Sequence, residues 1–252
     1  MFALFTDFGV EGPYLGQMKA VLHRRAPGVP VIDLMVDAPR FDPVASAYLL
    51  GAYLDCGAFC AGDVVVAVVD PGVGGDRRAL VLEADGLWLV GPDNGLLEIA
   101  ARRARRARRV TWWEIRWRPA ALSTSFHGRD LFAPVAAELA GGAPVSEGGG
   151  AEVLMPVDHA PDHGLSSDRA EVLYIDAFGN AVTGLRASQV RSGQPLRCTG
   201  QTVPFARTFS ERPPGAPLWY ANSAGLVELA LNQGRADGAP LHAVVGTRVV
   251  PT

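Results

Sequence analysis

The feature that most constrains the fold is a continuous apolar run, Val-Val-Val-Ala-Val-Val, at residues 64–69. A short run that is apolar at every position and rich in β-branched residues predicts a strand covered on both faces, as in the centre of a parallel sheet. Around this run, over roughly the first 140 residues, short apolar segments alternate with helical patterns. Such alternation is typical of βαβ units, so the sequence predicts an α/β domain with a largely parallel sheet.

The individual elements follow from hydrophobic spacing and turn chemistry. Asp42-Pro43 supplies an N-cap and a first-turn proline to the second of the predicted helices. Asp85-Gly86 supplies a hairpin turn between the last two predicted strands. The predicted strands are Phe2–Thr6, Val31–Leu34, Val64–Val69, Ala79–Glu83 and Leu87–Val90, and the predicted helices are Tyr14–Arg25, Val44–Leu54, Gly95–Arg106 and Asp130–Leu139.

The pattern changes after residue 140, where glycines, prolines and turn formers replace the periodic segments. We expect an N-terminal α/β domain at residues 1–145, a linker at 146–168 and a second domain at 169–252. The apolar runs in the second domain are short and favour a small all-β fold. They are Val172–Ile175, Ala181–Leu185, Gln201–Phe205, Leu218–Ala221 and Leu241–Val250.

Composition narrows the class of protein further. The 252 residues are 48% apolar and 19% charged, with a net charge of −3 and three cysteines. This apolar fraction argues against disorder, and three cysteines in so long a chain argue against a disulfide scaffold. No stretch of about 18 apolar residues is present, and the first residues lack the basic flank of a signal peptide. We therefore expect a reduced, cytoplasmic protein without a membrane partner.

The basic residues are almost all arginine, since Lys19 is the single lysine among 23. Six arginines lie between Arg102 and Arg109, which raises the hypothesis of a nucleic-acid-binding helix. However, the run repeats as Arg-Arg-Ala, which spreads its charges around a helix, and the whole chain is acidic. A solvated helix end is the favoured interpretation, so we expect no nucleic-acid partner.

Two aspartates follow predicted strands: Asp7 ends the first, and Asp70 ends the 64–69 run. In an open α/β sheet, ligands bind beyond the carboxyl ends of the strands. A single aspartate there is more often a turn cap, but two at one edge favour a site. Asp70 also opens the sequence Asp-Pro-Gly-Val-Gly-Gly, whose glycines allow a close backbone approach.

An arginine and a histidine are candidates to join these aspartates. Arg77 follows the glycine loop and could hold a carboxylate through two N–H groups, although a surface arginine is an equal alternative. His127 lies in a loop that leads into a predicted helix, where an ordinary hydrogen-bonded loop histidine is the commoner case.

Other chemical motifs are weak. Cys56 and Cys60 have an x3 spacing at the end of a helix, which favours structural thiols over metal ligands. Asp158-His159 and Asp162-His163 lie in the predicted linker with no element to fix them as a metal site. The usual dinucleotide, triphosphate and serine-hydrolase motifs are absent from the sequence, and we expect no metal and no cofactor.

Taken together, seven ordered motifs resemble one known family. The chain closely resembles the S-adenosyl-L-methionine (SAM) hydroxide adenosyltransferases, which are adenosine-forming SAM hydrolases related to fluorinase and chlorinase. The motifs are Thr6-Asp-Phe-Gly9, Tyr14-Leu-Gly-Gln-Met-Lys19, Val68-Val-Asp-Pro-Gly-Val-Gly74 with Arg77-Arg78, Val90-Gly-Pro-Asp-Asn-Gly-Leu-Leu97, Phe126-His-Gly-Arg-Asp130, Tyr174-Ile-Asp-Ala-Phe-Gly-Asn180 and Asn222-Ser-Ala-Gly-Leu-Val-Glu228.

The resemblance implies an N-terminal α/β domain, a C-terminal β-barrel, and a homotrimer that binds SAM between neighbouring subunits. It maps the family's catalytic triad onto Asp70, Arg77 and His127, and its ribose-binding aspartate onto Asp7. The implied contacts to adenine and methionine are Asp176, Phe178, Asn180, Ser223 and Glu228.

These assignments predict hydrolysis of SAM to adenosine and L-methionine by water or hydroxide at the ribose C5′. Arg77 would stabilise hydroxide, and His127 would accept or relay the proton. A carboxylate such as Asp70 would repel a halide, which favours hydrolase over halogenase. A sensor that binds adenosine or SAM without turnover is a further alternative.

Overall fold

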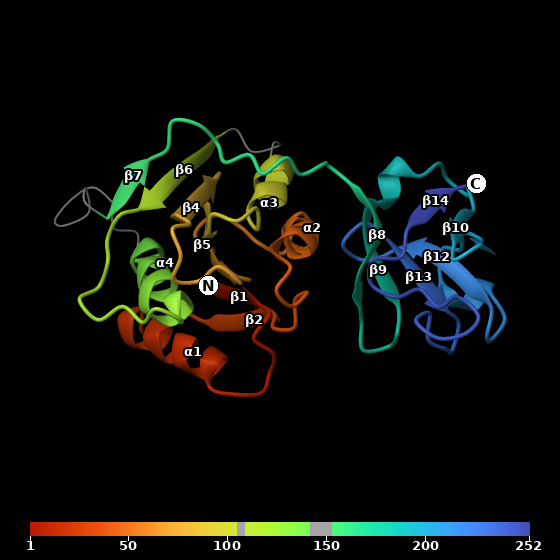
Figure 1. The fold of residues 1–252 in the computed structure, drawn as a ribbon, viewed down its shortest axis with the longest axis horizontal. Helices are drawn as coiled ribbons and strands as arrows, with labels where there is room; N and C mark the ends of the chain where they lie inside the picture. The colour runs from red at the N-terminus through yellow and green to blue at the C-terminus, as the bar shows by residue number, and fades with distance from the viewer. Residues whose placement is uncertain (105–108, 142–152) are drawn as a thin grey trace. The chain divides into compact units, whose positions relative to one another are not determined.

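The computed structural model describes residues 1–104, 109–141 and 153–252. These residues form two compact units, Met1–Leu165 and Ser166–Thr252. Each unit has its own hydrophobic core (Figure 1).

Unit 1 is built on a seven-stranded sheet in the order β2-β1-β3-β5-β4-β6-β7. The first four strands in this order pair in parallel, whereas the β5-β4, β4-β6 and β6-β7 pairs are antiparallel. The predicted largely parallel sheet is therefore confirmed, with an antiparallel extension at one side. The strands are β1 (Phe2–Thr6), β2 (Val31–Met35), β3 (Val64–Val68), β4 (Ala79–Ala84), β5 (Leu87–Pro92), β6 (Val110–Ile115) and β7 (Leu154–Pro156).

Helices cover both faces of this sheet. In Figure 1, α1 (Tyr14–Arg25) and α4 (Ala133–Ala140) lie on one side, and α2 (Pro43–Leu54) and α3 (Glu98–Arg103) on the other. Every residue of β3 is buried, which confirms the central strand predicted from its continuous apolar run. The side chains of alternate β3 residues point to opposite faces of the sheet. Val64, Val66 and Val68 pack in the core on the α1 and α4 side.

The predicted local signals are confirmed in unit 1. The Asp42 side chain accepts a hydrogen bond from the Ala45 N–H at 2.8 Å and caps α2. Ala84 pairs with Leu87 across the hairpin turn, where Asp85 and Gly86 have φ values of 49° and 88°. Positive φ at both central residues is the conformation that a tight β-hairpin requires.

Unit 2 contains only short helical turns, η3 (Ala187–Gln189) and η4 (Phe209–Glu211), and antiparallel strands. The predicted small β domain is confirmed, but its strands form two separate sheets, and the described residues contain no closed barrel. A four-stranded sheet has the order β12-β13-β9-β8, and a three-stranded sheet has the order β11-β10-β14. These strands are β8 (Arg169–Ile175), β9 (Ala181–Arg186), β10 (Leu196–Cys198), β11 (Gln201–Val203), β12 (Pro217–Ala221), β13 (Leu226–Leu231) and β14 (Val249–Pro251).

Some elements differ from the sequence prediction. The structure adds strands β6, β7, β10 and β13, none of which was predicted, and β7 lies inside the predicted linker. The predicted strand at Leu241–Val250 is wrong over most of its length, because β14 begins only at Val249. Positive φ values at His242 and Gly246 bend the chain where a strand would be extended.

Residues 153–165 belong to unit 1, and β7 pairs with β6 there. Within the predicted linker, residues 146–152 lie outside the described residues, as do Arg105, Arg106 and Arg108 of the arginine run. In the described ranges, no helix is long and apolar enough to cross a membrane.

Candidate active site

A cavity of about 630 Å³ opens in unit 1 at the carboxyl ends of β1 and β3. Its volume lies in the usual range for sites that bind small organic molecules. It is lined by Asp7, Phe8, Glu11, Tyr14, Arg40, Phe41, Val68, Asp70, Pro71, Val73, Ser125, Phe126, His127 and Gly128.

The sheet brings Asp7 and Asp70 to this cavity together. Strands β1 and β3 are parallel neighbours in which Thr6 pairs with Val68, so the residues that follow them emerge at the same edge. The Asp7 carboxylate accepts a hydrogen bond from the Phe41 N–H at 3.0 Å. Burial raises the pKa of the Asp7 carboxyl, and the Phe41 hydrogen bond opposes that rise.

Asp70 and Arg77 form a buried ion pair. The Arg77 Nε lies 3.0 Å from Oδ1 and 2.9 Å from Oδ2 of Asp70, and Nη2 also donates to Oδ2. The two side chains are only 4% and 12% exposed, for Asp70 and Arg77 respectively. A guanidinium that donates through two nitrogens fixes both the position and the orientation of the carboxylate.

His127 completes this group, because Arg77 Nη2 lies 2.9 Å from His127 Nδ1. Arginine is always protonated and can only donate, so Nδ1 must accept, which assigns a neutral imidazole with its proton on Nε2. Burial lowers the pKa of His127, and the charge of Arg77 lowers it further, against the opposing effect of Asp70. Asp70 and His127 line the cavity; Arg77 contacts both and is not among the lining residues.

Two local features bring the His127 loop against the Asp70 loop. Gly74 has a φ of 82°, and an added Cβ there would overlap the carbonyl oxygen of Thr124. Only glycine permits this backbone approach at no cost. Directly after His127, the chain forms a π-helix, η2 (Gly128–Phe132), before it continues as α4. Single π turns of this kind often occur at functional sites.

Three aromatic residues in the cavity wall were not predicted as site residues. The rings of Phe8, Tyr14 and Phe126 are in mutual contact, with centroids 5.3 to 5.8 Å apart. All three stand inside the family motifs, beside the predicted site residues. Phe41 was also missed: it is 75% exposed and lines the cavity with a φ of 59°.

In unit 2, Asp176 and Asn180 are joined in the turn between β8 and β9. The Asp176 carboxylate accepts from the N–H groups of Phe178 at 2.9 Å and Asn180 at 2.8 Å, and from the Asn180 side chain at 3.0 Å. This rigid turn presents the Phe178 ring to solvent at 78% exposure. An exposed aromatic ring on a hydrogen-bonded turn is a suitable contact for a planar ligand.

Glu228 lies buried near this turn and accepts hydrogen bonds from Tyr220 and from Asn222, the latter at 2.9 Å. Burial raises the pKa of Glu228, while these two donors oppose the rise. Burial and the neighbouring Glu228 also raise the pKa of Tyr220. Of the residues predicted in unit 2, the structure therefore groups Asp176, Asn180 and Glu228, and Ser223 is exposed on the turn after β12.

The alternative metal motifs take other contacts. His163 lies against Asp93 and Glu98, and Cys60 contacts Asp63. Among the residues that the structure describes, no group of three or more His, Cys, Asp or Glu side chains is placed to hold a metal ion.

The fold and the site define a class: an α/β unit with a carboxylate, guanidinium and imidazole group at a cavity, followed by an antiparallel β unit. Residues 2–149 match the SAM hydroxide adenosyltransferase N-terminal domain, and residues 170–249 match the C-terminal domain of the same family. The chain belongs to the SAM hydroxide adenosyltransferase family.

Individual relatives match along almost the whole chain. An (R)-S-adenosyl-L-methionine hydrolase from Thermus thermophilus is 45% identical over 93% of this chain and 92% of that protein. One from Salinispora arenicola is 42% identical over 92% of this chain and 90% of that protein. A crystal structure of a conserved protein from Thermotoga maritima has a TM-score of 0.82 at 28% identity, covering 100% of this chain and 99% of that one. A fluorinase from an Actinoplanes species is more distant, at 25% identity over 91% of this chain and 90% of that protein.

Proposed function

We propose that this chain hydrolyses S-adenosyl-L-methionine to adenosine and L-methionine. The observation that carries the proposal is the Asp70–Arg77–His127 group beside a cavity of nucleoside size, in a chain of the SAM hydroxide adenosyltransferase family. Its relatives from Thermus and Salinispora are named as hydrolases of this substrate.

The reaction needs activation of water more than activation of the leaving group. The water oxygen forms a bond to C5′ of the ribose, and the C5′–S bond breaks with its electron pair moving to sulfur. The positive sulfonium thereby departs as the neutral thioether of methionine. One proton is released, and no external electron donor or acceptor takes part, so the chemistry requires no cofactor.

Asp70 and His127 act on the attacking water at the cavity wall. Arg77 holds the Asp70 carboxylate through two nitrogens, and burial lowers the pKa of His127, which keeps its imidazole neutral. Asp70 takes up the proton that the water loses, because its two oxygens have lone pairs beyond those that accept from Arg77. The neutral His127 ring accepts from Arg77 at Nδ1 and carries its proton on Nε2, so it acts on the water as a donor. Arg77 holds the two groups in place and supplies positive charge near the developing hydroxide.

Substrate binding is divided between the two units of the chain. Asp7, fixed by the Phe41 N–H, accepts hydrogen bonds from the ribose hydroxyls and aligns C5′ with the attacking water. In unit 2, Asp176, Phe178, Asn180, Ser223 and Glu228 contact the adenine and methionine ends. The exposed Phe178 ring and the buried acceptors beside it support this role.

Isotope labelling tests the reaction and its position at once. Incubation with SAM in water enriched in ¹⁸O should give adenosine that carries the label at its 5′-hydroxyl, together with unlabelled methionine, by mass spectrometry. Intact SAM, or 5′-methylthioadenosine as the nucleoside product, would contradict the proposal. Tight adenosine binding in calorimetry without any product would favour the sensor interpretation.

A halogenase is the second candidate, because a fluorinase is a distant relative. The buried Asp70 carboxylate lines the cavity and would repel a halide ion at the position of the nucleophile. We therefore expect no 5′-fluoro- or 5′-chloro-adenosine even at high halide concentration.

We propose further that the enzyme is a homotrimer in which unit 1 of one subunit and unit 2 of the next complete each site. The exposed Phe41 beside the cavity and the exposed Phe178 support this proposal, because each presents an aromatic ring that a ligand shared between two subunits would cover. A chain carrying His127→Asn and a chain carrying Phe178→Ala, each impaired alone, should regain activity when refolded together. Mixtures no more active than the sum of the two variants would contradict a shared site.

The configuration at sulfur is the remaining point of specificity. Four relatives carry the (R) descriptor in their names, so we propose that this chain also acts on the (R) epimer of the sulfonium. Separated (R) and (S) epimers, assayed under equal conditions, should show a higher kcat/KM for (R).

A further inference from the structure

The order of strands in the sheet separates the strands adjacent to Asp70 and Arg77, the two partners of the ion pair. Asp70 follows β3 and Arg77 precedes β4, but β5 lies between these strands in the sheet. Two strand spacings separate β3 and β4 by about 10 Å. The Asp70–Arg77 pair therefore forms above the end of β5, where Asp93 and Asn94 follow its last residue, Pro92.

Asn94 is bonded to the β3 side of this loop. Its Nδ2 donates to the carbonyl oxygen of Val69 at 2.9 Å, and Val69 directly precedes Asp70. Its Oδ1 accepts from the Leu96 N–H at 3.3 Å, which fixes the orientation of the side chain. These contacts fix the backbone at Val69, where the chain leaves β3, and therefore the position of Asp70.

Asp93 is bonded to the β4 side. Its N–H donates to the carbonyl oxygen of Arg78 at 3.0 Å, and its Oδ2 accepts from the Arg78 Nε at 2.7 Å. Arg78 directly follows Arg77, whose Nη1 lies 3.5 Å from the same Arg78 carbonyl. The adjacent pair Asp93–Asn94 thus holds the residue before Asp70 and the residue after Arg77.

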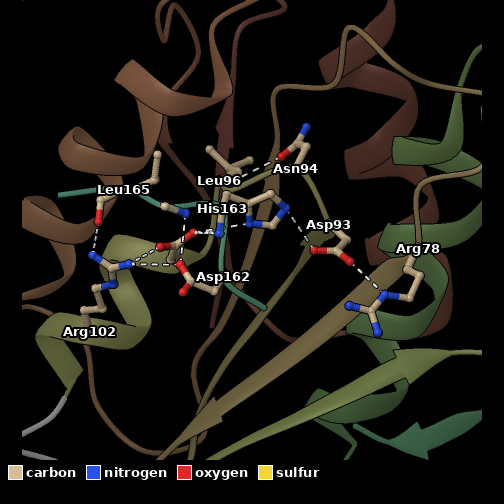
Figure 2. A network of polar contacts seen from close by, with 10 residues as sticks. Arg78, Asp93, Asn94, Leu96, Arg102, Asp162, His163 and Leu165 are labelled. Atoms are coloured by element: carbon tan, nitrogen blue, oxygen red, sulfur yellow. Dashed lines mark hydrogen bonds and ion pairs between the residues drawn. The ribbon is translucent and has the colours of Figure 1, made fainter. Parts of the chain in front are cut away.

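A second layer of contacts supports Asp93, as Figure 2 shows. The His163 Nε2 lies 3.4 Å from Asp93 Oδ1, on the opposite side of the carboxylate from Arg78. His163 is itself held by Glu98, through its Nδ1 at 3.2 Å and its N–H at 2.9 Å. Arg102 binds Glu98 and the carbonyl of Leu165. The Asp93 side chain is 11% exposed; Arg78 binds its Oδ2, and its Oδ1 faces the His163 ring without a hydrogen bond in the described structure.

We propose that Asp93 and Asn94 are positioning residues that set the geometry of the Asp70–Arg77 pair. Neither is among the residues that line the cavity. They act on the reaction through Val69 and Arg78. The inference rests on the proposed function for its catalytic consequence, while its structural consequence can be measured without substrate.

Asn94→Asp is the sharpest variant, because it keeps the size and the acceptor to Leu96 but replaces the donor to Val69 by an oxygen. Two acceptors then face each other, and Asp70 shifts. We expect kcat to fall about 10- to 100-fold and KM to change less than about twofold. The matched control is Asp33→Asn, which removes an exposed 2.7 Å ion pair with Lys19 and should leave both constants unchanged.

A second readout follows the ion pair directly. The Arg77 Nε–H, which donates to Asp70, should exchange slowly with water in a ¹H–¹⁵N spectrum, and its signal is identified by its loss in Arg77→Lys. We expect exchange at least about tenfold faster in Asn94→Asp, and unchanged in Asp33→Asn. If Asn94→Asp does not fold by circular dichroism, the same measurements on Asp93→Asn decide the matter.

The outcomes separate the two proposals. A folded variant with unchanged exchange overturns the positioning role, whatever its kcat, and so does a variant that alters KM alone. Faster exchange in a protein whose wild type leaves SAM intact supports the positioning role and contradicts the proposed function.

Discussion

Arg77 fixes the orientation of the two groups beside it. Its guanidinium donates to the Asp70 carboxylate and to Nδ1 of His127, and its charge adds to burial in lowering the pKa of His127. A lysine could not replace it, since one ammonium group does not supply the same fixed directions. The site therefore depends on geometry as much as on charge.

The variant His127→Asn tests the role of the imidazole in the reaction separately from its contact with Arg77. The Asn side-chain oxygen can still accept from Arg77, but the shorter side chain removes the Nε2–H group that the neutral imidazole offers to the water. We expect kcat to fall by about 10² to 10⁴ with little change in KM, measured by adenosine release. His23→Asn, the same change at an exposed helix position, serves as the control and should retain full activity.

The dependence of activity on pH follows from the pKa of His127. Burial and then the charge of Arg77 lower this pKa from 6.5, so the imidazole stays neutral until the pH falls below that value. The acidic limb of kcat/KM should therefore lie below pH 6.5. In Arg77→Met the limb should move to higher pH, because one cause of the lowered pKa is removed. An acidic limb above pH 6.5 in the wild type would contradict this account.

At the residue scale, sequence reasoning identified the chemical groups but not their contacts. Asp70 and Arg77 are close in the chain, whereas His127 reaches them only because the β5 hairpin, β6 and the following loop return to the same edge. No local sequence pattern predicts that the chain comes back to this edge of the sheet. The aromatic wall of Phe8, Tyr14 and Phe126 was missed because single apolar residues in loops look like ordinary core residues.

Among the loops, the contact between Gly74 and Thr124 is the tightest constraint on the site. Gly74→Ala adds a Cβ that overlaps the Thr124 carbonyl and must also adopt a positive φ. We expect unfolding free energy to fall by about 2 to 4 kcal/mol in chemical denaturation, with a large loss of kcat.

Gly28→Ala separates the two causes. Gly28 has a φ of 86°, and nothing lies within 4 Å of an added Cβ, so this variant measures the backbone strain alone. It should cost about 1 kcal/mol and leave activity unchanged. Equal losses in the two variants would show that the contact between the loops contributes nothing.

Elements with strong local signals were predicted well, and those defined by tertiary contacts were not. The β3 run, the Asp42 cap and the Asp85-Gly86 turn each carry their structure in a few residues. By contrast, β13 reads Leu-Val-Glu-Leu-Ala-Leu, a composition equally suited to a helix, and becomes a strand through pairing with β9 and β12.

For the whole molecule, the division into two units predicts two kinds of kinetic defect. Changes at Asp70 or His127 should act on kcat, and changes at the unit 2 turn should act on KM. Phe178→Ala should raise KM about tenfold through lost ring contact while kcat changes little, in steady-state assays. A loss of kcat alone would place Phe178 in the chemical step and contradict its assignment to binding.

The change from an α/β to a β pattern was visible in the sequence, because the hydrophobic period itself changes. The absence of barrel closure in the described part of unit 2 was not, since closure depends on which strands pair at long range. The same holds for assembly, which residue patterns in one chain do not encode.

The boundary between Leu165 and Ser166 is also a point at which recombination between related genes would exchange one whole unit. Asp7, Asp70, Arg77 and His127 all precede it, and Asp176, Phe178, Asn180, Ser223 and Glu228 all follow it. A single crossover at this point would exchange the proposed ligand contacts of unit 2 while passing on the proposed water-activating group of unit 1 intact. Recombination among members of the family could in this way alter selectivity without rebuilding the chemistry.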